Sequence, residues 1–81
     1  MKVNILYFAR VAEITGCPRQ EIELDAGATA GEALAAAARL HPVLAGPGFS
    51  PLLAVNREHA DAGRVLAHGD EVAIFPPVSG G

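Results

Sequence analysis

The 81-residue sequence contains one cysteine, few basic residues and no long apolar run, and each scarcity excludes a class of protein. The lone cysteine, Cys17, cannot form a disulfide within the chain. Six Lys and Arg residues against nine Asp and Glu residues give a net charge of −3, so the basic surface that nucleic acid requires is missing. No apolar run approaches the roughly 20 residues that span a bilayer, and no signal-peptide pattern is present. We therefore expect no nucleic-acid or membrane partner, and a cytoplasmic location.

The sequence also lacks the clustered ligands of a metal site. Its histidines, His41, His59 and His68, are expected in separate loops or at the ends of elements. Cys17 is the only other soft ligand, and a zinc site needs several such ligands close together. We therefore predict that the chain binds no metal.

Catalytic constellations are missing from the sequence as well. Glu21, Glu23 and Asp25 alternate along one predicted strand, which indicates a solvated face and not a pair of catalytic carboxylates. The glycines at 46 and 48 lack the strand-to-helix context and the lysine of a phosphate-binding loop. Only Arg19 is close enough in sequence to activate Cys17, so we interpret that cysteine as an ordinary loop residue.

Apolar residues, in contrast, make up 51% of the chain, which is typical of one globular domain with a modest core. Runs of β-branched and aromatic residues predict strands, and Gly and Pro separate them. Val65 and Leu66 are expected to anchor the irregular segment 61–68 to the core. The predicted strands are residues 2–8, 19–25, 52–56, 59–60 and 72–75, and residues 9–15 form a short helical turn.

The main helix is predicted from about residue 30 to residue 40. Thr29 and Glu32 have the spacing of a capping box, in which each side chain accepts a hydrogen bond from the other residue's backbone. Pro42 disfavours helical backbone at the preceding residue, so the helix ends near there. The apolar stripe of this helix is predicted to consist of Ala30, Leu34, Ala37, Ala38 and His41.

The order of these elements predicts the fold. The strands at the two ends of the chain are apolar on both faces, so we place them side by side at the centre of the sheet. One helix and four or five strands give a mixed sheet with the helix across one face. This is the α+β class with the β-grasp, or ubiquitin-like, arrangement. We predict a domain over residues 1–75 and a flexible tail over residues 76–81.

Alternation along the two central strands predicts an apolar patch on the face away from the helix. If Val72 and Ile74 face the helix, Phe75 points to the other side of the sheet. The same reasoning sends Leu6 and Phe8 outward on the first strand. Phe8 and Phe75 would then form an exposed patch of the kind that marks protein interfaces.

The last six residues form a slim arm that ends in two glycines. Pro76 and Pro77 end the preceding strand because neither can donate to a ladder. A terminal Gly-Gly arises by chance in about 1 chain in 200, so it gains meaning only because a strand feeds directly into it. The arm can reach about 20 Å when extended. The carboxylate at its tip is the one reactive group that is both exposed and mobile. The arm consists of Pro76, Pro77, Val78, Ser79, Gly80 and Gly81.

These features together resemble the small subunit of molybdopterin synthase, over nearly the whole chain. The resemblance lies in residues 3–10, the turn at Asn56, residues 69–72 and above all the ending from Phe75 to Gly81. Two positions depart from the family pattern. His68 stands where the family usually has an acidic residue, and His59 stands where a large apolar residue fits.

The resemblance implies that the chain carries sulfur as a protein cosubstrate and is not catalytic alone. An activating enzyme, an adenylyltransferase, would use ATP and Mg²⁺ to adenylate Gly81, and a sulfur donor would then leave a glycyl thiocarboxylate. No cofactor would be bound by the chain directly. The large synthase subunit would contact Phe8, Phe75 and residues 76–80, in a 2:2 heterotetramer, and would transfer the sulfur to cyclic pyranopterin monophosphate.

Three other readings stay open at this stage. A sulfur carrier of thiamine synthesis shares the fold and the Gly-Gly ending, but typically lacks Phe75-Pro76-Pro77. A ubiquitin-like modifier would instead form isopeptide bonds with lysines. The third alternative is a binding module whose terminus is merely frayed.

Overall fold

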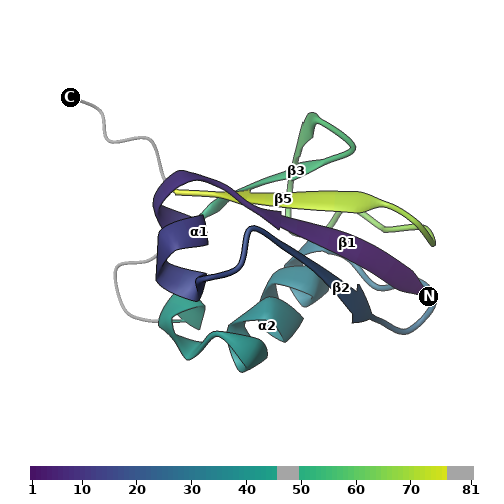
Figure 1. Ribbon diagram of the computed structural model, residues 1–81. Helices are drawn as coiled ribbons and strands as arrows, with labels where there is room; N and C mark the ends of the chain where they lie inside the picture. Colours follow the sequence, from purple (N-terminus) through teal and green to yellow (C-terminus); the bar gives the residue numbers. More distant parts are fainter. Residues whose placement is uncertain (46–49, 77–81) are drawn as a thin grey trace.

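The computed structural model describes residues 1–45 and 50–76, and these form a mixed sheet with one main helix across one face (Figure 1). The predicted α+β class is confirmed, with five strands in the sheet. In chain order the elements are β1 (Lys2–Tyr7), α1 (Ala9–Thr15), β2 (Arg19–Glu23), α2 (Ala30–Leu40), the 3₁₀ helix η1 (Pro42–Ala45), β3 (Leu52–Val55), β4 (Glu58–Ala60) and β5 (Glu71–Phe75).

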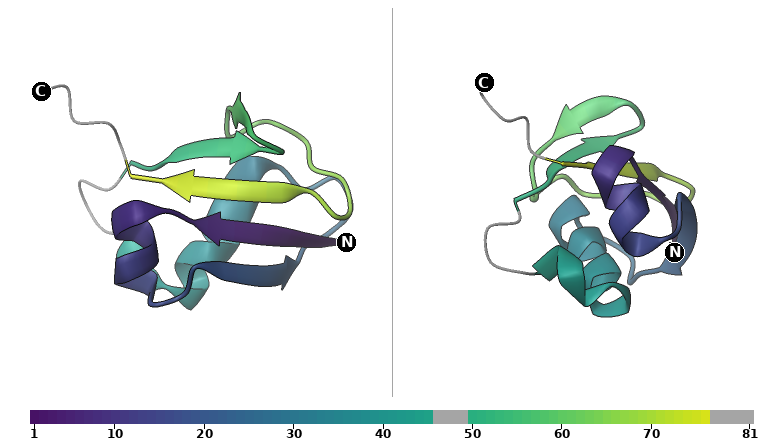
Figure 2. Two further views of the ribbon diagram at one scale, coloured as in Figure 1. Left: turned by 45° about the horizontal axis from the view of Figure 1, so that its top comes forward. Right: turned by 60° about the vertical axis from the view of Figure 1, so that its left-hand side comes forward.

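The sheet has the strand order β2-β1-β5-β3-β4. As predicted, the first and last strands lie side by side and run parallel, with Ile5 opposite Val72 (Figure 2). The remaining neighbours pair antiparallel. Because β1 and β5 run in the same direction, the residues that follow them, α1 after β1 and Pro76 after β5, begin at the same end of the sheet.

The hydrophobic core lies between the sheet and α2. The inward side chains of β1 and β5 alternate as the sequence predicts, and α2 contributes mainly alanines, whose small side chains let the helix approach the sheet closely. The predicted helix stripe is shifted, because Ala33 is fully buried whereas Leu34 and Ala38 are only partly buried. The largest fully buried side chains are Val3, Ile5, Val11, Val55, Val72 and Ile74.

The N-terminus of α2 is fixed by its cap and by a close backbone contact. The Thr29 hydroxyl accepts a hydrogen bond from the Glu32 N–H at 3.2 Å, and the Glu32 carboxylate accepts one from the Thr29 N–H at 3.1 Å. Gly31 donates its N–H to the carbonyl oxygen of Ala62 at 2.8 Å. A Cβ at position 31 would lie 2.9 Å from the Ala62 Cβ, so a larger residue here would require the two segments to move apart.

The segment between β4 and β5 corrects one prediction. Leu66 is buried, as expected, but Val65 is 61% exposed and does not anchor the core. Val65 instead pairs through its backbone with Thr29 in an isolated bridge. The side chain at 65 therefore points to solvent while its backbone holds the segment against the start of α2.

Among the described helices, none has the length and apolar character needed to cross a membrane.

Candidate functional site

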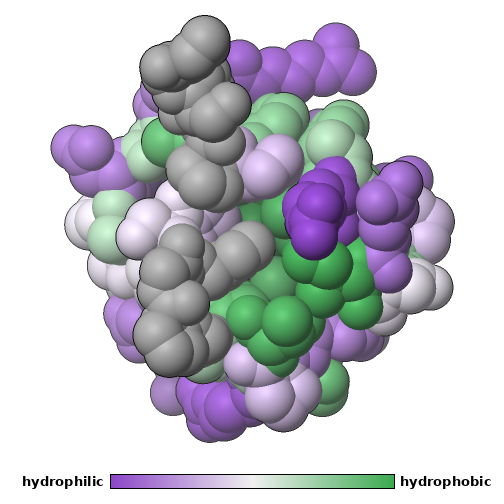
Figure 3. Space-filling view, turned by 90° about the vertical axis from the view of Figure 1, so that its left-hand side faces the viewer, coloured by the Kyte–Doolittle hydropathy of each residue, from purple (hydrophilic) through white to green (hydrophobic). Residues whose placement is uncertain are grey.

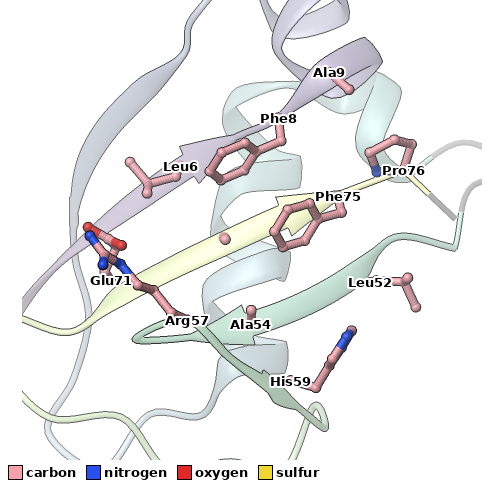
Figure 4. A pocket seen from close by; sticks show the side chains of 11 residues that line it. Leu6, Phe8, Ala9, Leu52, Ala54, Arg57, His59, Glu71, Phe75 and Pro76 are labelled. Atoms are coloured by element: carbon pink, nitrogen blue, oxygen red, sulfur yellow. The ribbon is translucent and has the colours of Figure 1, made fainter. Parts of the chain in front are cut away.

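The face of the sheet opposite α2 carries the predicted aromatic pair. Phe8 follows β1 and Phe75 ends β5, and their rings stack with centroids 4.8 Å apart and planes at 14° (Figure 4). Such a geometry is favourable for aromatic rings. Phe8 is 40% exposed and Phe75 is partly buried, so the pair lies at the surface of the domain. The predicted outward direction of both rings is confirmed.

The aromatic pair forms one wall of a surface pocket of about 670 Å³. Ala54 of β3 and Ala73 of β5 are direct neighbours across the sheet, and both contribute to the lining. Because their side chains are short, the sheet is hollowed between the larger residues around them. Leu52, which is opposite Phe75 in the ladder, lines the pocket beyond the aromatic ring (Figure 4).

The end of the molecule toward which β1 and β5 run is rich in apolar surface (Figure 3). Polar side chains border the pocket on two sides. Arg57 and Glu71 lie next to each other at its other end, and His59 extends from β4 on the side of Ala54 and Leu52 (Figure 4). An apolar centre with a polar border is the usual anatomy of a protein–protein interface. The pocket therefore suits a protein partner better than a small polar ligand.

Backbone strain gathers beside this pocket. Asn56 and Arg57 form the two-residue turn between β3 and β4, and both have positive φ, at 50° and 71°. This is the turn type that favours glycine at the second position, yet Arg57 occupies it. Ala9, at the start of α1, also has a positive φ of 51°. Of these three strained residues, Ala9 and Arg57 line the pocket, and such strain clusters at functional sites.

A hydrogen-bond network fixes the strained turn to the start of β5. The Asn56 side-chain amide donates to Asp70 at 3.0 Å, while its oxygen accepts from the Glu71 N–H at 3.0 Å. The Ala67 N–H also donates to the Asp70 carboxylate, at 2.8 Å. The bond from Asn56 and then that from Ala67 lower the pKa of Asp70 below its ordinary value. The network thereby positions Arg57 and Glu71 at the border of the pocket.

The sequence of this chain matches one known protein family over most of its length. The ThiS family model matches residues 5–81. The chain belongs to the ThiS family.

Similar ThiS-family relatives differ in their names. The molybdopterin synthase sulfur carrier subunit of Chlamydomonas reinhardtii is 39% identical, with all of both chains covered. Small archaeal modifier protein 1 of Haloferax volcanii is also 39% identical, over 91% of this chain and 94% of its own. The crystal structure of that modifier protein superposes with a TM-score of 0.88 at 36% identity, with all of both chains covered.

Three of the predicted interface residues meet at the pocket of this ThiS-family chain. Phe8, Phe75 and Pro76 all line it. Pro76 is the last described residue, so the arm begins at the edge of the pocket. The remaining predicted site residues, which are Pro77, Val78, Ser79, Gly80 and Gly81, lie outside the described residues and stay predictions.

The other reactive side chains lie apart from one another. Cys17 follows α1 and donates its thiol hydrogen to the Arg19 carbonyl at 2.9 Å. His68 Nδ1 accepts a hydrogen bond from the Lys2 N–H at 3.0 Å and does not line the pocket, whereas His59 is the one histidine in that lining. Over residues 1–45 and 50–76, no three His, Cys, Asp or Glu side chains are close enough to hold a metal ion.

Sequence reasoning missed six residues of the pocket, namely Ala9, Leu52, Ala54, Arg57, Glu71 and Ala73. The signal for three of them was present in the sequence. β3 reads Leu-Leu-Ala-Val, apolar on both faces like the two central strands, and alternation places Leu52 and Ala54 on the outer face. Ala73 lies between the inward Val72 and Ile74. No comparable pattern indicated Arg57.

Proposed function

We propose that this chain is the sulfur-carrier small subunit of a molybdopterin synthase. The observation that carries the proposal is the apolar pocket of Phe8 and Phe75 at the base of an arm that ends in Gly-Gly. A partner that binds over this pocket also contacts the start of the arm, because Pro76 lines the pocket. Several curated relatives at 37–39% identity are named molybdopterin synthase sulfur carrier subunits, which supports the same assignment.

The proposed chemistry takes place on the carboxylate of Gly81. This carboxylate attacks the α-phosphate of ATP in an activating enzyme, which releases pyrophosphate and leaves a glycyl adenylate. A sulfur donor then displaces AMP and leaves a thiocarboxylate. The thiocarboxylate sulfur finally attacks a carbon of cyclic pyranopterin monophosphate and displaces its oxygen substituent, which gives a thioester between the chain and the pterin. Water then cleaves the acyl–sulfur bond, so the sulfur stays on the pterin and the chain returns to the carboxylate form. Gly80 and Gly81 have no side chains, so the arm suits a channel too narrow for other residues.

The proposed partner at the pocket is the large synthase subunit. It would cover the stacked rings and hold the pterin, while this chain supplies the arm and its sulfur. We propose a 2:2 assembly with the large subunits at the centre, because the chain resembles the small subunit of molybdopterin synthase. Two sulfur atoms form the dithiolene of the product, so two charged small subunits are used for each molecule.

A second candidate function comes from one of the relatives. Small archaeal modifier protein 1 of Haloferax volcanii has the same sequence identity to this chain as the carrier subunit of Chlamydomonas reinhardtii, 39%. A protein modifier would use the same adenylated glycine but transfer it to a lysine, with an isopeptide bond as the result. Covalent conjugates of this chain in an extract of its host would identify that function.

Deletion of Gly81 tests the sulfur-carrier proposal. The deletion shortens the arm by about 3.3 Å. This is well beyond the misplacement of about 1 Å that already costs roughly a hundredfold in rate. We expect the deleted chain to fold normally and to accept no sulfur. The measurement is molybdopterin formation from the purified precursor, with the activating enzyme, ATP and a sulfide source, together with the intact mass of the charged chain.

The matched control is Cys17→Ser, which removes the only thiol of the chain and leaves the arm unchanged. This variant is expected to retain sulfur transfer and the mass gain of sulfur for oxygen. Near wild-type product from the Gly81 deletion would disprove the carrier function. A folded but inactive Cys17→Ser chain would indicate that the Cys17 thiol, and not the arm, carries the sulfur.

A further inference from the structure

A second groove, of about 470 Å³, lies between β2 and α2, on the face of the sheet that carries the helix. Ile22 and Leu24 form its strand side, and both are only partly buried. Its helix side is formed by Ala35, Ala36 and Leu40, and the short alanine side chains leave space for the groove. Leu40 is 52% exposed. The groove is thus an open trough lined by apolar and charged residues, separate from the pocket of Phe8 and Phe75.

The trough follows an edge of the sheet that has free backbone groups. β2 is the outermost strand beside β1 (Figure 2). Leu24 exchanges both backbone hydrogen bonds with Met1, at 2.8 and 2.7 Å. Alternation in an antiparallel ladder then turns the N–H and C=O groups of Glu21 and Glu23 away from β1. Among the described residues these groups have no partner strand, so another strand can pair there.

The charges around the trough select the kind of strand that fits. Two acidic residues, Asp25 and Glu32, line it against the single guanidinium of Arg39. Glu23 borders the trough as well, but alternation with Ile22 and Leu24 turns its carboxylate to the other face of the sheet. Glu21 also extends from the outer edge, and its only ion pair in the described chain is a loose one with Lys2, at 3.9 Å. The edge is therefore acidic and complementary to a basic segment.

The same charges disfavour a second copy of this chain as the occupant. Antiparallel pairing of β2 with the β2 of another copy would place the carboxylates of Glu21 and Glu23 opposite or diagonal to identical carboxylates. Like charges that face each other across strands are destabilising. The acidic edge thus opposes self-association and favours a cationic strand.

We infer that the trough binds an extended segment of another protein in which apolar residues alternate with lysine or arginine. The segment adds to β2 as a sixth strand through the backbone groups of Glu21 and Glu23. Side chains of a strand alternate between faces, so its apolar residues enter the trough beside Ile22 and Leu24. Its cations then lie on the opposite face, next to the Glu21 and Glu23 carboxylates. This site lies at the β2 edge and shares no residue with the pocket of Phe8 and Phe75, so it is independent of the proposed sulfur chemistry.

The first test uses a capped synthetic peptide, Lys-Ile-Lys-Ile-Lys-Ile-Lys, added to the full isotope-labelled chain. We expect amide NMR shifts within residues 19–25 and along α2, with slower hydrogen exchange at Glu21 and Glu23. The matched probe is the same peptide N-methylated at alternate residues, which cannot pair with a strand edge. It should bind at least tenfold more weakly. Equal binding of both peptides, or shifts confined to the pocket of Phe8 and Phe75, would overturn the inference.

The second test reverses the charge of the edge. The double variant Glu21→Lys with Glu23→Lys should bind the peptide at least tenfold more weakly, with its fold checked by thermal unfolding. Glu58→Lys is the matched control, because Glu58 is an exposed carboxylate on β4, the opposite edge of the sheet. This control should bind like the parent chain. Unchanged binding by the double variant, or dimerisation of the parent through β2 in sedimentation, would contradict the proposed occupant.

Discussion

Tyr7 shows how far a single side chain can be predicted from the sequence. Alternation along the first strand predicts that it faces the core, and it is 3% exposed. Its hydroxyl donates to the Gln20 side-chain oxygen at 3.0 Å, and His41 Nε2 lies 3.1 Å from the same oxygen. These partners come from β2 and from the end of α2. Only the folded chain brings them together, so no spacing in the sequence could indicate the contact.

The ionisation of Tyr7 is a direct test of this packing. Burial, with a smaller contribution from the charge of Cys17, raises the pKa of Tyr7 from 10.0 to about 12. Because the folded pKa is raised, the stability linked to the neutral form is complete below pH 10 and is lost as the pH rises toward 12. The chain has one tyrosine and no tryptophan, so the ultraviolet absorbance of the phenolate reports Tyr7 alone.

We expect the native protein to titrate near pH 12 and the urea-unfolded chain to titrate near 10. Tyr7→Phe provides the blank, because it removes the signal. If the native and unfolded chains titrate at the same pH, Tyr7 is solvated and the side-chain contacts with Gln20 and His41 are wrong.

At the scale of elements, the cap of α2 was predicted correctly and carries a measurable stability. Thr29 and Glu32 form the full capping box. Thr29→Ala removes the acceptor of the Glu32 N–H, and a lost cap of this kind costs about 1 kcal/mol. Urea unfolding followed by circular dichroism should show a lower midpoint with an unchanged slope.

Thr29→Ser is the matched control for this change, since it keeps a hydroxyl at the cap position. It should retain most of the stability of the parent chain. Equal losses in Thr29→Ala and Thr29→Ser would attribute the effect to the methyl group of Thr29 and not to the hydrogen bond.

The elements that could be predicted are those with a periodic pattern. β1 and β5 alternate, β3 is apolar throughout and α2 has its cap, so their existence and order follow from the sequence. The segment 61–69 has no period, and the choice between Val65 and Leu66 as the buried residue could not be made from the sequence. Its position depends on backbone hydrogen bonds to Ala28, Ala30 and Gly31, which only the tertiary fold supplies.

At the scale of the whole molecule, the pocket follows from the pairing of the two chain ends. Parallel neighbours end at the same edge of the sheet, so the positions of Phe8 and Phe75 on one face could be predicted. The depth of the pocket could not, because it depends on the register that sets Ala54 opposite Ala73. Arg57 reaches the border only through a strained turn. The division into a domain over 1–75 and a tail over 76–81 stays a prediction, although Pro76 lies against the domain in the pocket lining.

The proposed assembly with the large subunit predicts that Phe75 contributes more to binding than to folding. Phe75→Ser removes the ring that stacks on Phe8, and such pairs contribute roughly 0.5–1.5 kcal/mol, so stability should fall by about 1 kcal/mol. Residues at the centre of an interface cost about 2 kcal/mol or more when truncated. The dissociation constant for the large subunit should therefore rise by roughly thirtyfold or more. Calorimetric titration gives the affinity, and urea unfolding gives the stability.

Val65→Ser is the control for this prediction, because Val65 is an exposed apolar side chain that does not line the pocket. Loss of the Val65 side chain should leave the affinity for the large subunit unchanged. This result would show that binding depends on the pocket and not on exposed apolar surface in general. Equal free-energy losses in binding and folding for Phe75→Ser would assign Phe75 to the core. Unchanged binding would indicate that the partner contacts another face of the sheet, since the stacked rings would then stay exposed in the complex.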